Sequence, residues 1–383
     1  MTVWFSASAV LPSLKHEFAL TDSHGAVLTS AVSVGFVAGT LCSALLGLAD
    51  RIDQRRFFAA ACVMAAVANA GMLALEPGSA WVVMLRFLVG ASAAGIYPVG
   101  MRMVAAWARV DMGLLVGALV GAQVLGLASP HLIDALGGFD WRVTLACASA
   151  LALAAGVLVN AVSLGPNLVR PAVFRARFVM NAWRQKSIRL ANIGYLGHMW
   201  ELFAMWGWIG LFLVASFEHR PGGPDAIWWA KVTAFASIAM GAPGCLIGGF
   251  LADRYGRTTV TIGALAISGA CSVAVGGFYG GDPLILTAIC LIWGAAVVAD
   301  SPQFTASVAE LSEPQLVGTM ITIQTCAGFL LTTATIQLVP FLVGQMGWSY
   351  TFVVLAAGPA VGIVAMLRLR RHPDAVRLAN GNR

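Results

Sequence analysis

The stretch Gly249-Phe250-Leu251-Ala252-Asp253-Arg254-Tyr255-Gly256-Arg257 ends one long apolar segment and precedes the next. Its core occurs 203 residues earlier as Leu48-Ala49-Asp50-Arg51, again between two apolar segments. Pro98 and Pro302, each inside a longer apolar segment, lie 204 residues apart. Because two independent matches share nearly the same offset, the sequence predicts a duplicated unit.

The composition places that unit in a membrane. Of the 383 residues, 59% are apolar and only 10% are charged, against about 25% charged in soluble domains. So few charged residues cannot cover the surface of a soluble protein of this size. The high fraction of apolar residues also excludes a disordered chain. The mean hydropathy of +0.83 agrees. The sequence therefore predicts an all-α integral membrane protein.

Apolar runs long enough to cross a bilayer, about 20 residues each, can be counted along the chain. The count predicts eleven spans, at 26–49, 57–75, 81–107, 112–133, 141–163, 189–216, 227–251, 259–279, 283–308, 316–340 and 348–367. The segment from Met1 to Leu14 is apolar but too short to cross alone. We interpret it as a first helix shortened at its N-terminal side, which makes twelve helices.

The Lys and Arg residues predict the orientation, because cytoplasmic loops carry an excess of them. Eighteen of the 23 lie in segments that share one side if both termini are cytoplasmic, and four lie in segments on the other side. We therefore expect a multi-pass protein of the cell inner membrane with both termini in the cytoplasm.

The longest cytoplasmic segment divides the chain. Residues 164–188 are basic and contain Pro166 and Pro171, which indicates a linker and topology anchor, with no role in nucleic-acid binding. The sequence predicts an N-terminal six-helix bundle at 1–163, this linker, a C-terminal six-helix bundle at 189–369 and a cytoplasmic tail at 370–383. Two such bundles enclose a central cavity whose access can alternate.

With these features the chain resembles the major facilitator superfamily. The resemblance rests mainly on the signature G-x-L-A-D-R-x-G-R, which is complete at 249–257. The copy at 46–55 lacks both glycines at their expected places. The resemblance implies two six-helix bundles and a gating role for this loop on the cytoplasmic side. Carboxylates and arginines there can form contacts that hold one conformation. The expected gate comprises Asp50, Arg51, Arg55, Arg102, Asp253, Arg254, Gly256 and Arg257, with Arg102 the expected partner of Asp50.

Charged side chains inside the predicted spans are candidates for the transport pathway, because a charge at the bilayer centre is costly. Three such side chains lie well within the spans: Arg86, Glu201 and Asp300. His198 lies on the same helix face as Glu201, and an imidazole beside a carboxylate can hold a proton near neutral pH. Arg86 is expected to bind an anionic solute or to pair with one of the acids. Further candidates to line the pathway are Tyr97, Gln123, Gln303, Gln324 and Trp208.

Several chemistries are not expected. The sequence has no phosphate-binding loop, no HExxH and no CxxC pair, and its seven cysteines lie in apolar stretches. We therefore expect no enzyme activity, cofactor or metal. The predicted function is secondary active transport of a small solute, with a polar or anionic metabolite favoured and protons as the coupling ion. The alternatives are a proton-coupled exporter of hydrophobic drugs and, more remotely, a non-transporting membrane sensor. The protein is expected to act as a monomer in the lipid bilayer.

Overall fold

The computed structural model describes residues 1–107, 112–137, 140–166, 178–219 and 226–382. Within these ranges the regular structure is helical throughout. The helices are α1 (Ser6–Ala9), α2 (Leu11–Phe18), α3 (Asp22–Leu46), α4 (Leu48–Arg51), α5 (Gln54–Gly71), α6 (Ala80–Ala93), α7 (Tyr97–Ala105), α8 (Met112–Leu136), α9 (Trp141–Leu158), α10 (Asn181–Arg184), α11 (Lys186–Glu218), α12 (Ala226–Ala239), α13 (Gly241–Tyr255), α14 (Arg257–Ala274), α15 (Pro283–Ala299), α16 (Ser301–Leu311), α17 (Val317–Met346), α18 (Trp348–Thr351) and α19 (Ala357–Arg370). Short 3₁₀ segments follow α5, α9, α14, α18 and α19.

Among the described residues, eleven helical stretches are long and apolar enough to cross a membrane. They correspond one to one with the eleven spans predicted from the sequence, and they confirm that count. Four of them join two α-helices into one stretch, namely α6 with α7, α12 with α13, α15 with α16, and, through a 3₁₀ segment, α18 with α19. The segment before α3 forms only the short helices α1 and α2.

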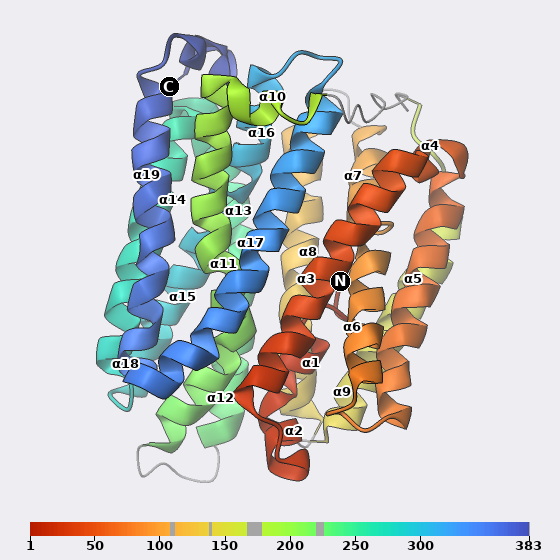
Figure 1. The fold of residues 1–383 in the computed structure, drawn as a ribbon, viewed down its shortest axis with the longest axis vertical. Coiled ribbons are helices and arrows are strands. Elements are labelled where there is room, and N and C mark those ends of the chain that lie inside the picture. Colours follow the sequence, from red (N-terminus) through yellow and green to blue (C-terminus); the bar gives the residue numbers. More distant parts are fainter. Residues whose placement is uncertain (108–111, 138–139, 167–177, 220–225, 383) are drawn as a thin grey trace.

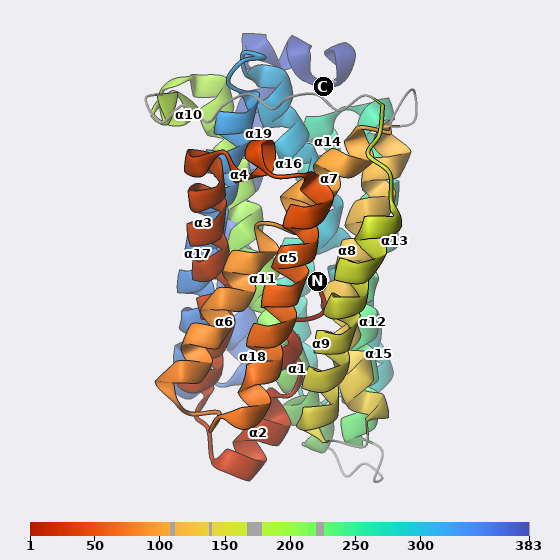
Figure 2. The same ribbon diagram turned by 90° about the vertical axis from the view of Figure 1, so that its right-hand side faces the viewer.

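The helices form two side-by-side groups (Figure 1). The N half contains α1 to α9, and the C half contains α11 to α19. We call the end with α4 and α10 the linker end, and the opposite end, with α2 and α18, the far end (Figures 1 and 2). The N-terminus lies at mid-height between the halves, and Met1 lines the cavity described below (Figure 1).

Helices join the halves in two places. In the first place, α3 packs on α17. Gln337 of α17 donates to Ser30 of α3 over 2.8 Å, and Thr332 of α17 donates to Ser33 of α3 over 3.2 Å. In the second place, α8 packs on both α12 and α13. Gly117 on α8 allows close approach to α13, because a Cβ there would lie 2.9 Å from the side chain of Leu246. Small and polar side chains therefore carry the contact between the halves.

Candidate functional site

The stretch formed by α6 and α7 in the N half and the stretch formed by α15 and α16 in the C half are interrupted at equivalent points. In the N half, α6 ends at Ala93 and α7 restarts at Tyr97 with Pro98 in its first turn. In the C half, α15 ends at Ala299 and α16 restarts at Ser301 with Pro302 in its first turn. A proline fits a first helical turn, because its missing N–H has no partner there in any helix. The repeated prolines that suggested a duplication from the sequence thus mark a repeated break.

These breaks border a cavity between the halves. Tyr97 and Ser301, which occupy equivalent places in the two halves, both line it. The cavity has a volume of about 120 Å³. Its described lining consists of uncharged side chains: Met1, Trp4, Phe36, Tyr97, Val120, Gln123, Val124, Leu127, Tyr195, Met199, Leu202, Phe203, Trp206, Val298, Ser301, Thr305, Thr325 and Phe329.

An aromatic cluster forms one side of this cavity. The ring centroids of Phe36 and Phe329 are 4.5 Å apart, and those of Phe203 and Phe329 are 4.9 Å apart. Trp4 packs against all three phenylalanines at 5.5–5.7 Å. Phe36 and Trp4 belong to the N half, whereas Phe203 and Phe329 belong to the C half. The cluster therefore joins the halves without any charge.

The buried acids of the C half lie behind the cavity lining, beside residues that face it. His198 Nδ1 of α11 lies 2.9 Å from Asp300 Oδ1, an ion-pair distance without the alignment of a hydrogen bond, and both side chains are 1% exposed. Asp300 sits in the break between α15 and α16, directly before Ser301. Within the described ranges, His198 Nε2 has no hydrogen-bond partner. The imidazole and the carboxyl group thus form a buried pair with spare hydrogen-bonding capacity.

Glu201 points elsewhere. It accepts hydrogen bonds from Trp293 Nε1 of α15 at 2.7 Å and from Ser268 of α14 at 2.9 Å. It is fully buried inside the C half and is not part of the cavity lining. The carboxylate that partners His198 is therefore Asp300, not Glu201 as the helix-face argument suggested. His198 and Glu201 lie three positions apart on α11, so their side chains reach different partners. His198 reaches the break between α15 and α16, and Glu201 reaches α14 and α15.

Arg86 has a different environment from the one expected. Its guanidinium is fully buried in the N half and donates to the backbone oxygens of Val3 at 2.9 Å, Leu28 at 3.4 Å and Trp4. It also donates to Ser6 at 3.2 Å and to Asn69 at 3.3 Å. The expected pairing with Glu201 or Asp300 is not formed, because those acids belong to the other half. Neutral oxygens of α1, α3 and α5, and of the chain before α1, surround the charge and tie these segments to α6.

The remaining pathway candidates divide into two groups. Tyr97 and Gln123 line the cavity. Trp208 does not: it is buried and donates to the backbone oxygen of Ile336 at 3.1 Å. Gln324 donates to Phe304 at 3.5 Å, and Gln303 accepts from Arg257 Nη1 at 2.7 Å. These three side chains connect helices of the C half.

The second signature copy holds the C half together at the linker end. Arg257 makes its closest ion pair with Glu310 of α16, at 2.6 Å, and lies 3.8 Å from Asp253. Gly256 has φ +92°, a left-handed turn that favours glycine between α13 and α14. Arg254 lies over the ring of Tyr255 at 5.5 Å. All these contacts stay within one half.

The first copy turns the chain in another way. Gly47 takes the left-handed conformation, with φ +61°, and the position equivalent to Gly256 is Asp53, whose side chain caps α5. Asp53 also pairs with Arg55 at 3.1 Å. That hydrogen bond from Arg55 lowers the pKa of the Asp53 carboxyl group. Arg51 is exposed and Arg102 is half-buried, while the side chain of Asp50 lies outside the described residues, so its expected contact with Arg102 stays a prediction.

The sequence analysis missed a buried ion pair between the halves. Lys231 Nζ of α12 lies 2.5 Å from Asp134 Oδ2 of α8, and the two side chains are 3% and 0% exposed. Lys231 lies near the start of the predicted span at 227–251, and Asp134 lies one residue beyond the predicted span at 112–133. The sequence did contain a signal for these two residues, because each is a single charge between apolar neighbours. Ile133 and Ala135 flank Asp134, and Ala230 and Val232 flank Lys231.

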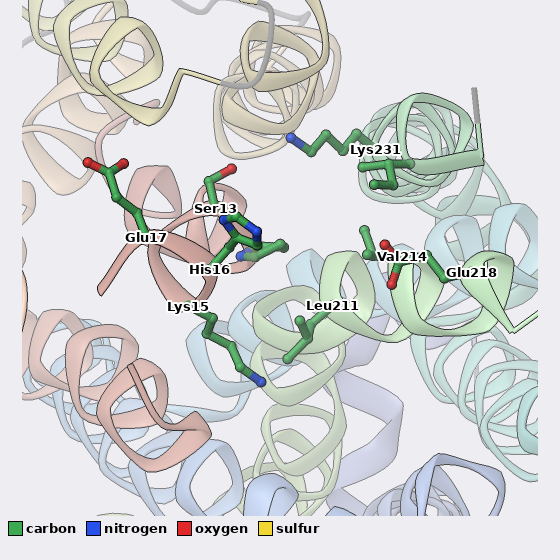
Figure 3. Close-up of a pocket in the computed structure, with 10 residues that line it drawn as sticks. Ser13, Lys15, His16, Glu17, Leu211, Val214, Glu218 and Lys231 are labelled. Atoms are coloured by element: carbon green, nitrogen blue, oxygen red, sulfur yellow. The ribbon is translucent and has the colours of Figure 1, made fainter. Parts of the chain in front are cut away.

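Lys231 of this pair lines a second cavity, of about 830 Å³, at the far end (Figure 3). The cavity lies between α2 of the N half and α11 and α12 of the C half, and Lys15, His16, Glu17, Glu218 and Lys231 contribute its charges. Glu17 accepts from Trp141 at 2.7 Å and from Arg142 at 2.9 Å, and the bond from Arg142 is the main cause of its lowered pKa. Figure 3 shows the five charged or ionisable side chains of the lining, Lys15, His16, Glu17, Glu218 and Lys231, arranged around the cavity.

Two similar halves, broken helices beside a central cavity and buried charges behind it define a membrane protein built from two helical bundles. The profile of the Major Facilitator Superfamily matches residues 1–219 and 222–383. The chain therefore belongs to that family, whose relatives below are transporters and not enzymes.

Two curated relatives from Escherichia coli (strain K12) are similar to part of the chain. The 3-(3-hydroxy-phenyl)propionate transporter is 29% identical over 174 residues, or 42% of each chain. Inner membrane transport protein YnfM is 24% identical over 271 residues, or 67% of this chain and 61% of its own length. The matches thus span about two fifths and three fifths of those proteins.

Solved structures agree with the fold. A D-xylose-proton symporter superposes with a TM-score of 0.74 at 15% identity and covers 98% of this chain and 96% of its own. The nucleoside transporter NupG gives 0.72 at 15% identity, with 96% of both chains covered. At these identities the likeness shows the shared fold.

Proposed function

We propose that this chain is a secondary active transporter that moves a small organic solute, together with protons, by alternating access. The solute binds in the central cavity, which both halves line at their repeated helix breaks. The bundles at 1–163 and 189–369 move as two bodies, with both termini cytoplasmic in a cell inner membrane. The neutral and aromatic lining supports a solute with a ring and a polar group, and the relative that transports 3-(3-hydroxy-phenyl)propionate is consistent with that class.

The observation that carries proton coupling is the buried His198–Asp300 pair. The carboxyl group lies in the α15–α16 break, one residue from the cavity lining at Ser301. A proton on this pair changes the charge behind the cavity, and so shifts the balance between conformations. Glu201, which packs against the neighbouring helices α14 and α15, is the second carboxyl group available to hold a proton.

The Asp134–Lys231 pair supports a gate at the far end. It joins α8 to α12 across the halves, so opening that end has to separate two opposite charges that are otherwise out of water. The Arg257–Glu310 pair, by contrast, holds α14 to α16 inside the C half. We propose that the signature loop at 249–257 stiffens the C half and that contacts of α8 with α12 and α13 hold the halves together.

Transport in proteoliposomes with an imposed pH gradient tests the proposal. The solute is chosen by a thermal-shift screen of metabolites, ring-bearing acids included, on the purified protein. Uptake that accumulates solute against its concentration, and stops when a proton carrier collapses the gradient, is the expected result. Transport that ignores the pH gradient would remove proton coupling from the account, and no transport of any stabilising solute would remove the function.

A further inference from the structure

Two hydrogen-bond donors in the central cavity have no partner among the residues that the structure describes. They belong to Trp4 and Trp206, which line the cavity and are 3% and 2% exposed. Neither indole Nε1 has a hydrogen-bond acceptor within reach in this part of the chain. A buried donor without an acceptor is unfavourable, because folding has removed the water that would satisfy it. A ligand that supplies an acceptor regains that loss.

The other buried tryptophans of the described chain are satisfied. Trp208 donates to Ile336, Trp293 to Glu201 and Trp141 to Glu17, at 2.7–3.1 Å. The unsatisfied indoles are therefore confined to the cavity, where a solute can reach them. They come from different halves, since Trp4 precedes α1 and Trp206 lies on α11.

The same cavity offers an aromatic surface. Trp4 packs on Phe203 at 5.7 Å, and Trp206 packs on Phe203 at 5.6 Å. Phe36 and Phe329 continue the cluster across the halves. When the halves separate, these ring contacts open together, and a solute ring can replace them with contacts of the same kind. The cavity of about 120 Å³ is slightly smaller than an apolar cavity of about 150 Å³ that accepts benzene, so a single ring fits once the halves begin to separate.

We propose that the solute carries an oxygen acceptor attached to a single ring, and that the indole N–H groups of Trp4 and Trp206 select it by donating to that acceptor. The inference rests on the proposed function, because it names the solute class of the same cavity. With no charged side chain in the described lining, a carboxylate acceptor enters with the coupled proton, whereas an amide or other carbonyl enters as it is.

Competition binding on the full chain in lipid nanodiscs tests this class. The probes share one ring and chain length: 3-phenylpropionate, radiolabelled, with 3-phenylpropionamide and propylbenzene as competitors. Because a site with buried donors rejects an analogue that leaves them unpaired, propylbenzene is expected to compete at least about tenfold more weakly than unlabelled acid. Equal competition by acid and amide identifies a carbonyl acceptor, and competition by the acid alone identifies a carboxylate. Competition by propylbenzene equal to that of the acid overturns the proposal, as does absence of saturable binding of the acid.

The variants Trp206→Phe and Trp4→Phe keep an aromatic ring and remove the N–H group. Each is expected to weaken binding of 3-phenylpropionate by about tenfold and to leave that of propylbenzene within twofold, which a general loss of packing would not do. Trp81→Phe is the control, since Trp81 is 71% exposed on α6. Unchanged acid binding in both cavity variants overturns the proposal. Proton-driven uptake of an unrelated solute would leave the proposed function intact while refuting this solute class.

Discussion

The two halves bury charge in opposite ways. In the N half, Arg86 donates to five neutral oxygens from the chain before α1 and from α1, α3 and α5. In the C half, His198 and Asp300 face each other with His198 Nε2 unpartnered. A fully satisfied charge fixes the helices that surround it, whereas an incompletely satisfied acid and base pair can change its protonation. From this contrast we propose that Arg86 stabilises the packing of the N half and that His198 and Asp300 couple solute movement to protons.

Replacing Arg86 is the largest expected perturbation. Arg86→Leu removes the donor of five buried hydrogen bonds, so we expect a loss of about 4 kcal/mol of stability. The thermal melting temperature in detergent and the yield of folded protein measure it. Arg86→Lys keeps a positive charge with fewer hydrogen-bond donors, so its melting temperature should lie between those of Arg86→Leu and the wild type. A variant that melts like the wild type but no longer binds solute would reverse the comparison, because Arg86 would then serve the solute.

Removing the protonatable groups of the C half is expected to affect coupling more than stability. His198→Gln and Glu201→Gln should each reduce uptake driven by a pH gradient by about tenfold or more, since a buried ionisable group is costly and is retained for function. Glu313→Gln, at an exposed position between α16 and α17, is the matched control. A Glu201→Gln protein that accumulates solute as the control does would limit the proton site to His198 and Asp300.

The pair between the halves gives a third, intermediate effect. Lys231→Met leaves the Asp134 carboxylate buried without its partner, and should favour opening at the far end by about 2–3 kcal/mol. A single cysteine placed at Ser13, in the wall of the far-end cavity, would then react faster with a water-soluble maleimide. Adding Asp134→Asn should restore slow labelling, because the unpaired charge is gone. If labelling stays fast after Asp134→Asn is added to Lys231→Met, the substitution has loosened the packing in general, and the ion pair does not hold the far end closed.

The smallest effect is expected at the surface pair of Glu17 and Arg142. The hydrogen bond from Arg142 lowers the pKa of Glu17, so its contribution to stability is present above the unfolded value of about 4.3 and disappears as the pH falls through the folded value. Glu17→Gln should therefore melt slightly below the wild type at pH 7, and the gap should close below about pH 4. Melting curves at both pH values measure the difference; a gap that widens in acid contradicts the assignment.

The sequence predicted what depends on periodicity and backbone chemistry. Apolar length predicted the eleven spans, and the shared offset of Pro98 and Pro302 predicted a duplicated unit, whose equivalent helix breaks the structure shows at these prolines. It could not predict which helices meet at a given depth. His198 and Glu201 share a face of α11, yet one reaches the α15–α16 break and the other reaches α14 and α15. Lys231 and Asp134 were missed because their pairing depends on contact between the halves.

Solute counterflow and pH-driven uptake by Asp300→Asn proteoliposomes test the central claim most directly. Counterflow needs only solute binding and exchange between the two sides, whereas accumulation needs the proton. If the His198–Asp300 pair couples the two, the variant keeps counterflow near the wild-type rate and loses accumulation driven by the pH gradient. Accumulation equal to that of the wild type would contradict the account, because the carboxyl group in the α15–α16 break would then take no part in coupling.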